Sequence, residues 1–166
     1  MGTGVVVRAI RPSGHSVGMT EGTAAAHGQG RSGHRSVPHT ADVRIEAWGA
    51  SRERCLVEAV LGMVEGFADV SGARPSGEAR LRLAEGNDED LLTALLDEVV
   101  FRLEVYGEVP VGLEVEASDG GLDVRMAVAH LGAVEVTGAA PKGVSWEDLH
   151  IGPGPDGWSC AVTVDV

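Results

Sequence analysis

The sequence predicts an α+β fold in which two helices pack on a mostly antiparallel sheet. Two segments repeat apolar residues at three- and four-residue steps, and several shorter ones alternate apolar and polar residues. The order is strand, helix, strand, helix and then a run of strands without crossover helices, which disfavours a doubly wound parallel fold. A chain of 166 residues can bury one sizeable core. We therefore expect one folded domain, covering residues 37–166.

Residues 1–36 are expected to form an extension in front of this domain. The stretch "SGHSVGMTEGTAAAHGQGRSGHRS" is rich in Gly, Ser and His and has no sustained period. Such a segment cannot bury enough apolar area to offset its ordering entropy, so we expect disorder. The opening "MGTGVVVRAI" is too short an apolar run for a signal peptide, and no segment approaches the roughly 20 apolar residues of a membrane helix. The expected location is the cytoplasm.

The first strand and the first helix follow one another directly. In "DVRIEAWG", Val43, Ile45 and Ala47 alternate with other residues, as in a strand with one buried face. Ser51 stands where a helix N-cap is expected. Apolar residues then recur at helical steps: Leu56, Ala59, Val60, Met63, Val64 and Phe67. After a break at "GARPSG", the segment "EARLRLA" predicts another short strand.

The second helix is predicted by its cap, its charges and its apolar face. Asn87 can cap it, and Asp88, Glu89 and Asp90 lie at the end where the helix dipole favours negative charge. Its apolar face comprises Leu91, Leu92, Leu95, Leu96, Val99, Val100 and Leu103. After "YGEVP" the period changes to two: "VGLEVEA" and "LDVRMAVAHLG" flank the turn "SDGG", and "AVEVTG", "KGVSWEDLHI" and "WSCAVTVDV" follow.

Composition narrows the function classes. The chain has 25 Asp and Glu against 13 Lys and Arg, a formal net charge of -12, which disfavours tight direct binding of nucleic acid. Cys55 and Cys160 lie in periodic apolar segments and are expected to be buried, reduced thiols, as in a cytosolic protein. No nucleophile elbow, phosphate-binding loop, dinucleotide fingerprint or H-E-x-x-H motif is present. The sequence thus shows no signature of independent catalysis.

Acidic groups stand at both ends of the expected domain. Asp42 opens the first strand, and Asp165 is followed by Val166 with its terminal carboxylate. If the first and last strands are neighbours, these groups form an all-oxygen cluster, which suits Ca²⁺, Mg²⁺ or Mn²⁺. Pattern alone favours the alternative that Asp42 is a turn residue and Asp165 a frayed polar terminus. A zinc site of His34 and His39 with Asp42 is the weaker metal hypothesis, because isolated His residues in such segments seldom bind metal.

Three separated segments resemble the archease family and follow the same order over about residues 37–166. They are "HTADVRIEAWG", the helix "DEDLLTALLDEVVFRLEVYG" and the closing "KGVSWEDLHIGPGPDGWSCAVTVDV". The resemblance implies an archease-like single domain that acts as a protein cofactor and not as an enzyme. Its implied partner is the GTP-dependent RNA ligase that joins 3′-phosphate ends to 5′-hydroxyl ends in tRNA splicing and RNA repair. The implied action is stimulation of ligase guanylylation and of multiple turnover, with no membrane involved.

The resemblance also implies where the functional residues lie. The family's metal ligands match Asp42, Asp165 and the carboxylate of Val166, and the resemblance favours Ca²⁺ over Mg²⁺ or Mn²⁺. The lysine of the closing motif matches Lys142, which either contacts a nucleotide phosphate or balances the acidic charge.

One position departs from the family pattern. Where the family commonly has an aromatic residue followed by His, this chain has Trp146 followed by Glu147. A glutamate adds a hard oxygen donor and removes a nitrogen ligand or proton carrier. Either the cation preference therefore differs from that of the family, or this position is peripheral to the site. The candidate contacts to the nucleotide or the ligase are Lys142, His39 and Glu147.

Two rival classes remain open at this stage. The first is a metal-dependent phosphohydrolase or nuclease that uses the same carboxylates, although a base, a nucleophile and a basic RNA track are missing. The second is a chaperone-like binding module, for which the sequence shows no large exposed apolar patch.

Overall fold

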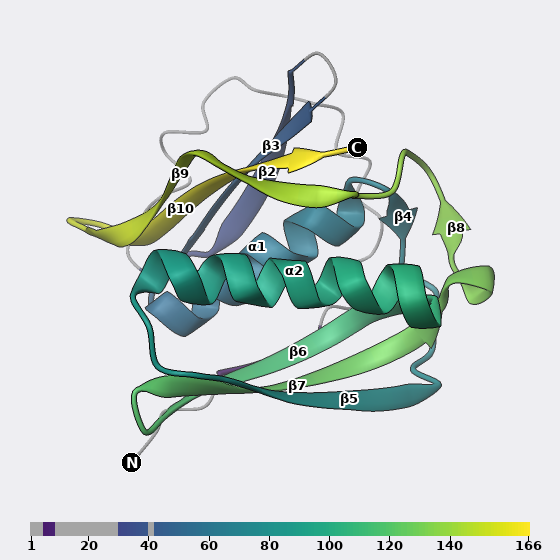
Figure 1. Ribbon diagram of the computed structural model, residues 1–166, viewed down its shortest axis with the longest axis horizontal. Helices are drawn as coiled ribbons and strands as arrows, with labels where there is room; N and C mark the ends of the chain where they lie inside the picture. Colours follow the sequence, from purple (N-terminus) through teal and green to yellow (C-terminus); the bar gives the residue numbers. More distant parts are fainter. Residues whose placement is uncertain (1–4, 9–29, 40–41) are drawn as a thin grey trace.

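The computed structural model describes residues 5–8, 30–39 and 42–166. Within them, two four-stranded antiparallel sheets enclose two helices, which gives three layers (Figure 1). The strand order is β1-β6-β7-β5 in one sheet and β2-β3-β10-β9 in the other, and β4 and β8 form a separate short pair. The bounds are β1 Val5–Arg8, β2 Gly33–His39, β3 Asp42–Gly49, α1 Arg52–Glu65, β4 Ala68–Asp69, β5 Gly77–Leu83, α2 Asp88–Tyr106, β6 Glu108–Ser118, β7 Gly121–His130, β8 Glu135–Val136, β9 Gly143–Gly154 and β10 Gly157–Asp165.

Helix α1 lies between the sheets and is buried on all sides. The Ser51 side chain caps it by accepting a hydrogen bond from the Arg54 amide at 3.1 Å. The helix contacts β2, β3 and β10 of one sheet and β1 and β6 of the other. Every residue from Cys55 to Val64 is therefore buried, including the charged side chain of Glu58. Helix α1 supplies the centre of the core.

Helix α2 lies beside α1 and keeps one face in solvent. The Asn87 side chain accepts a hydrogen bond from the Asp90 amide at 2.8 Å, and Gly107 ends the helix with a left-handed φ of 64°. The helix packs on β9 of one sheet and on β5 and β6 of the other. In Figure 1 it runs across the front of the molecule between the two sheets. Its leucine-rich face is buried against them.

The predicted α+β class, the two helices and both helix caps are confirmed. The sheet is divided into two, and some boundaries differ. Strand β6 begins at Glu108 although Pro110 follows, because Pro110 lies at a register irregularity where its missing amide is tolerated. "AVEVTG" contributes only the two residues of β8. Among the described helices, none is long and apolar enough to cross a membrane.

The structure corrects part of the expected extension over residues 1–36. Gly33–His39 form β2, which pairs with β3, and Val5–Arg8 form β1, which pairs with β6. The β2 segment shows no period of two in its sequence, and its contacts come from its neighbour: an added Cβ on Gly33 would lie 2.7 Å from the Trp48 ring of β3. Residues 1–4, 9–29 and 40–41 lie outside the described residues, and the expectation of disorder for 1–4 and 9–29 stays a prediction.

Candidate functional site

Asp42 and Asp165 lie directly opposite each other across two neighbouring strands. Asp42 is the first residue of β3, Asp165 is the last residue of β10, and the antiparallel register pairs them. Side chains at directly opposed positions leave the same face of a sheet, with Cβ atoms roughly 4.5–5.5 Å apart. The first and last strands of the expected domain are therefore neighbours in one sheet.

The two carboxylates leave the face of the sheet that points away from the helices. The adjoining residues Val43 and Val164 pack against the core on the helix side. Because successive side chains of a strand alternate between faces, Asp42 and Asp165 point to the outer side. Asp165 is exposed and Asp42 is half-buried, so both carboxylates are accessible to a ligand.

The same row continues across all four strands of this sheet. On β2, His39 is opposite Asp42, and on β9, Gly143 is opposite Asp165. We call His39, Asp42, Asp165 and Gly143 the acid row. The His39 side chain lies outside the part of the chain that the structure describes, and its backbone is placed by the register of β2. A Cβ on Gly143 would lie 3.9 Å from Asp165 Oδ2, so glycine leaves the space beside this carboxylate open.

Lys142 and Val166 flank the acid row. The Lys142 amide donates a 2.7 Å hydrogen bond to the Asp165 carbonyl oxygen, and the Lys142 side chain is exposed. The Val166 side chain packs against the core beside a small hollow of about 20 Å³ that Met63 and Pro141 also line. This packing anchors the residue that follows Asp165. The structure therefore brings Asp42, Asp165, Val166 and Lys142 to one end of the sheet.

Glu147 is not brought into the acid row. Ser145 of β9 pairs with Thr163, which is two residues and about 7 Å along β10 from Asp165. His150 then pairs with Ala161, so the residues between Ser145 and His150 form an enlarged bulge opposite one residue of β10. Asp148 takes a left-handed φ of 57° there. Glu147 is exposed on this bulge, and its amide bonds Ser145 Oγ at 3.1 Å.

The acid row provides the oxygen donors that a hard cation prefers, but it provides too few of them to complete the coordination of the cation. Asp42 and Asp165 offer oxygen donors, which Ca²⁺, Mg²⁺ and Mn²⁺ prefer. Among the described residues, no group of three or more His, Cys, Asp or Glu side chains is arranged to hold a metal ion. A cation at Asp42 and Asp165 would need further oxygens from the Val166 carboxylate, from water or from a partner.

His34 belongs to a different, buried cluster that the sequence did not indicate. Its Nδ1 hydrogen-bonds Glu58 Oε2 at 2.7 Å, and its Nε2 hydrogen-bonds Glu65. Burial lowers the pKa of His34, but the bonds to both carboxylates outweigh this and raise the pKa to about 9. Both ring nitrogens are occupied on the helix side of the sheet, so the zinc hypothesis with Asp42 loses His34. No spacing rule links a residue to partners 24 and 31 positions away.

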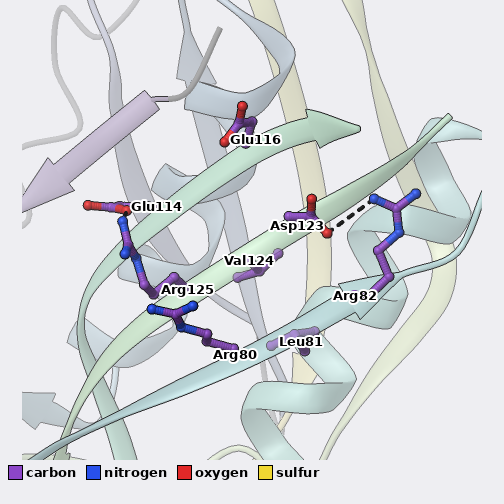
Figure 2. A pocket seen from close by; sticks show the side chains of 8 residues that line it. All are labelled: Arg80, Leu81, Arg82, Glu114, Glu116, Asp123, Val124 and Arg125. Atoms are coloured by element: carbon purple, nitrogen blue, oxygen red, sulfur yellow. Dashed lines mark hydrogen bonds and ion pairs between the residues drawn. The ribbon is translucent and has the colours of Figure 1, made fainter. Parts of the chain in front are cut away.

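A hollow lies on the outer face of the other sheet. It measures about 530 Å³, and Figure 2 shows its lining side chains on β5, β6 and β7. Its three arginines face three acidic residues: Arg82 is 3.1 Å from Asp123, and Arg125 pairs with Glu114. The hollow carries no excess positive charge to attract phosphate, so we do not regard it as the functional site.

Fold and site together define a three-layer α+β protein with opposed carboxylates at one end of a sheet. Residues 34–166 match the family described as "Archease protein family (MTH1598/TM1083)". The chain belongs to the archease family. The match begins one residue after the start of β2 and includes every element after it, with β1 outside it.

Proteins of the same family in other organisms are similar over most of this chain. "Probable protein archease" of Mycobacterium tuberculosis is 48% identical over 135 residues, which are 81% of this chain and 75% of that protein. "Protein archease" of Archaeoglobus fulgidus is 26% identical over 136 residues, which are 80% of this chain and 98% of that one.

Two solved structures share the fold. The solution structure of Methanobacterium thermoautotrophicum protein 1598 has a TM-score of 0.66 at 23% identity, covering 81% of this chain and 99% of that one. The crystal structure of a Thermotoga maritima archease, described as a possible chaperone, has a TM-score of 0.58 at 20% identity, covering 78% and 94%. At these identities the likeness shows the fold alone.

Proposed function

We propose that this protein activates a GTP-dependent RNA ligase that joins 3′-phosphate to 5′-hydroxyl ends in tRNA splicing and RNA repair. The activation consists of faster guanylylation of the ligase and restored multiple turnover. Family membership supports the proposal, and the observation that carries it is the direct opposition of Asp42 and Asp165. Both residues occupy the positions that the family resemblance gives to the metal ligands.

Asp42 and Asp165, with the carboxylate of Val166, would hold a divalent cation, with Ca²⁺ favoured over Mg²⁺ or Mn²⁺. Such an ion offsets negative charge that develops on phosphate oxygens during phosphoryl transfer. Opposed register holds the two carboxylates on one face, and Gly143 keeps the space beside Asp165 open. The exposed Lys142, tied to Asp165 through its amide, can contact a phosphate of the nucleotide.

The charge of the protein fits a role on the ligase better than a role on RNA. A net charge of -12 repels a nucleic-acid backbone but attracts the basic surface that a ligase needs around its own RNA and nucleotide. We propose that the protein has no turnover of its own and acts in the cytoplasm, which suits its two free, buried cysteines.

The test is multiple-turnover ligation by the host's own ligase with GTP and a divalent cation, with and without this protein. We expect stimulation by the wild type and at least a tenfold loss of it with Asp42→Asn, because one of the two opposed charges disappears. Asp156→Asn is the matched control, since Asp156 is exposed in the turn at the other end of β10. Equal stimulation by the wild type and Asp42→Asn would overturn the metal part of the proposal.

Binding of the cation is measured separately from ligation. Calorimetric titration of the wild type with Ca²⁺, Mg²⁺ and Mn²⁺ should show one site that Asp42→Asn weakens at least tenfold and Asp156→Asn leaves unchanged. A site that both variants retain would place the cation away from the acid row.

Two alternative functions are tested in the same preparation. A chaperone-like role, named as a possibility for the Thermotoga maritima relative, would appear as suppression of aggregation of unrelated client proteins. A phosphohydrolase or nuclease would turn over nucleotide or RNA without the ligase. Either result without ligase stimulation would replace the proposal.

A further inference from the structure

Three large apolar side chains are exposed close together at the C-terminal end of α2. Phe101 is 48% exposed, Val105 56% and Tyr106 54%. We call these three residues the α2 patch. The buried face of α2 packs on the two sheets, so the patch belongs to the helix face that neither sheet covers. Figure 1 shows α2 at the front of the molecule, between the sheets. Apolar clusters of this kind on an otherwise polar face are typical of protein contact sites.

The aromatic side chains of the α2 patch are held in place without a partner. The Phe101 and Tyr106 rings meet edge to face, with centroids 5.9 Å apart and an interplanar angle of 88°. The Arg102 guanidinium stands 6.0 Å from the centre of the Tyr106 ring. Arg102 is itself held by Glu98 at 3.0 Å and Glu108 at 3.4 Å. A partner would therefore pay little ordering entropy at these side chains.

The charges around the α2 patch are predominantly negative. Asp97 and Glu104 are exposed on the solvent side of α2, and Glu98 and Glu108 hold Arg102. Acidic side chains thus outnumber basic ones in this part of α2 and at the start of β6, with four carboxylates against the guanidinium of Arg102. Complementarity favours a partner with an apolar recess bordered by Arg and Lys.

We propose that the α2 patch is the docking surface for a basic protein partner, and that this partner is the RNA ligase. The identity of the partner rests on the proposed function, whereas its chemistry follows from the patch. Helix α2 packs on β9, and β9 begins directly after Lys142, beside Asp165. A ligase seated on α2 and β9 therefore also reaches the acid row. Docking on α2 and activation at the acid row are then served by different residues that β9 connects.

The experiment measures equilibrium binding of the purified ligase to the full chain by calorimetry, without RNA. Phe101→Ala and Tyr106→Ala should each weaken binding about 30-fold or more, as for an aromatic residue at the centre of an interface. Glu104→Lys should weaken it about tenfold at low salt and less at high salt, because a border charge acts mainly by long-range attraction. Val136→Ala and Glu116→Lys are the matched controls: Val136 is 57% exposed on β8, and Glu116 is exposed on the outer face of the other sheet.

The outcomes separate docking from activation. Docking is supported if the α2 patch variants weaken binding and raise the concentration for half-maximal stimulation while the controls match the wild type. Wild-type protein that binds through the patch but does not stimulate would overturn the proposed function and keep the docking surface. Stimulation with unchanged binding by Phe101→Ala and Tyr106→Ala would overturn docking and keep the function. No wild-type binding, or self-association that Phe101→Ala abolishes in sedimentation, would overturn the ligase as the occupant.

Discussion

At the scale of single residues, His34 shows how a buried charge is compensated between a strand and a helix. The Glu58 side chain is fully buried in α1, and a buried carboxylate is costly unless it is paired. His34 of β2 provides that pairing, and Glu65 at the end of α1 bonds its other nitrogen. The cluster ties β2 to the central helix.

The raised pKa of His34 predicts a pH dependence of stability. The folded pKa of about 9 exceeds the ordinary value of 6.5, so the stabilisation is fully present below pH 6.5 and disappears as the pH rises through about 9. We expect the free energy of unfolding in urea to fall by up to about 3 kcal/mol across this window.

Two variants show whether His34 is the source of that fall. Glu58→Gln keeps the shape and removes the charge, so most of the pH dependence should vanish. His150→Gln, which changes an exposed His on β9, should keep it. An undiminished fall in Glu58→Gln would assign the pH dependence to another group.

Among single residues, those at strand ends were the most predictable from sequence. Asp42, Asp165 and Lys142 could be selected because each belongs to a contiguous motif. Glu147 also belongs to a motif, but it lies on the bulge of β9 and is not paired beside the acid row. A bulge forms where one strand has more residues than the stretch of the partner strand opposite it. Its position therefore cannot be predicted from the sequence of one strand alone.

At the scale of elements, α1 differs from the amphipathic helix that its pattern indicated. The sequence stripe from Leu56 to Phe67 predicts one buried face, whereas a sheet covers the helix on both sides. Gly62 permits the close approach, since a Cβ there would lie 2.9 Å from Ile45 Cγ2 and 3.1 Å from His34 Cβ. The second sheet could not be predicted, because the apolar periodicity of a helix indicates which residues are buried and not which element covers them.

Gly62→Ala should destabilise the protein despite improving helix propensity. Alanine is better than glycine in a helix by about 1 kcal/mol, but overpacking against Ile45 and His34 costs about 1–3 kcal/mol. We expect a net loss of about 1 kcal/mol in urea unfolding, read from the midpoint at constant slope. Gly72→Ala is the control, because its Cβ meets no heavy atom within 4 Å. A stabilised Gly62→Ala would show that β2 and β3 can move away from α1 at little cost in free energy.

At the scale of the whole molecule, the three layers form one continuous core. Cys55 of α1 and Cys160 of β10 are both buried free thiols from different layers. A hydrogen bond with Cys160 and burial both raise the pKa of Cys55. The expected structural, reduced thiols are thus confirmed as buried and free, and a thiol held neutral in this way reacts slowly.

Thiol labelling should report global unfolding of the protein. We expect Cys55 and Cys160 to react with a thiol reagent at the same rate, because each becomes accessible only when helix and sheet separate. Mass spectrometry of protein labelled for increasing times measures this, and denaturant should accelerate both reactions equally. Cys160 reacting well before Cys55 would mean that β10 detaches from the sheet without unfolding of the helices.

If Asp42 and Asp165 hold a cation together, as proposed, their pairing also limits which changes in chain length the family can tolerate. Successive side chains of a strand point to opposite faces of the sheet. One residue inserted between Cys160 and Asp165 would therefore turn the Asp165 side chain toward the helices. Two inserted residues would restore the face but displace the carboxylate by about 7 Å along the strand. The turn between β9 and β10 carries no such restriction. Among relatives, insertions and deletions should therefore accumulate in that turn and be absent from the segment Cys160–Asp165.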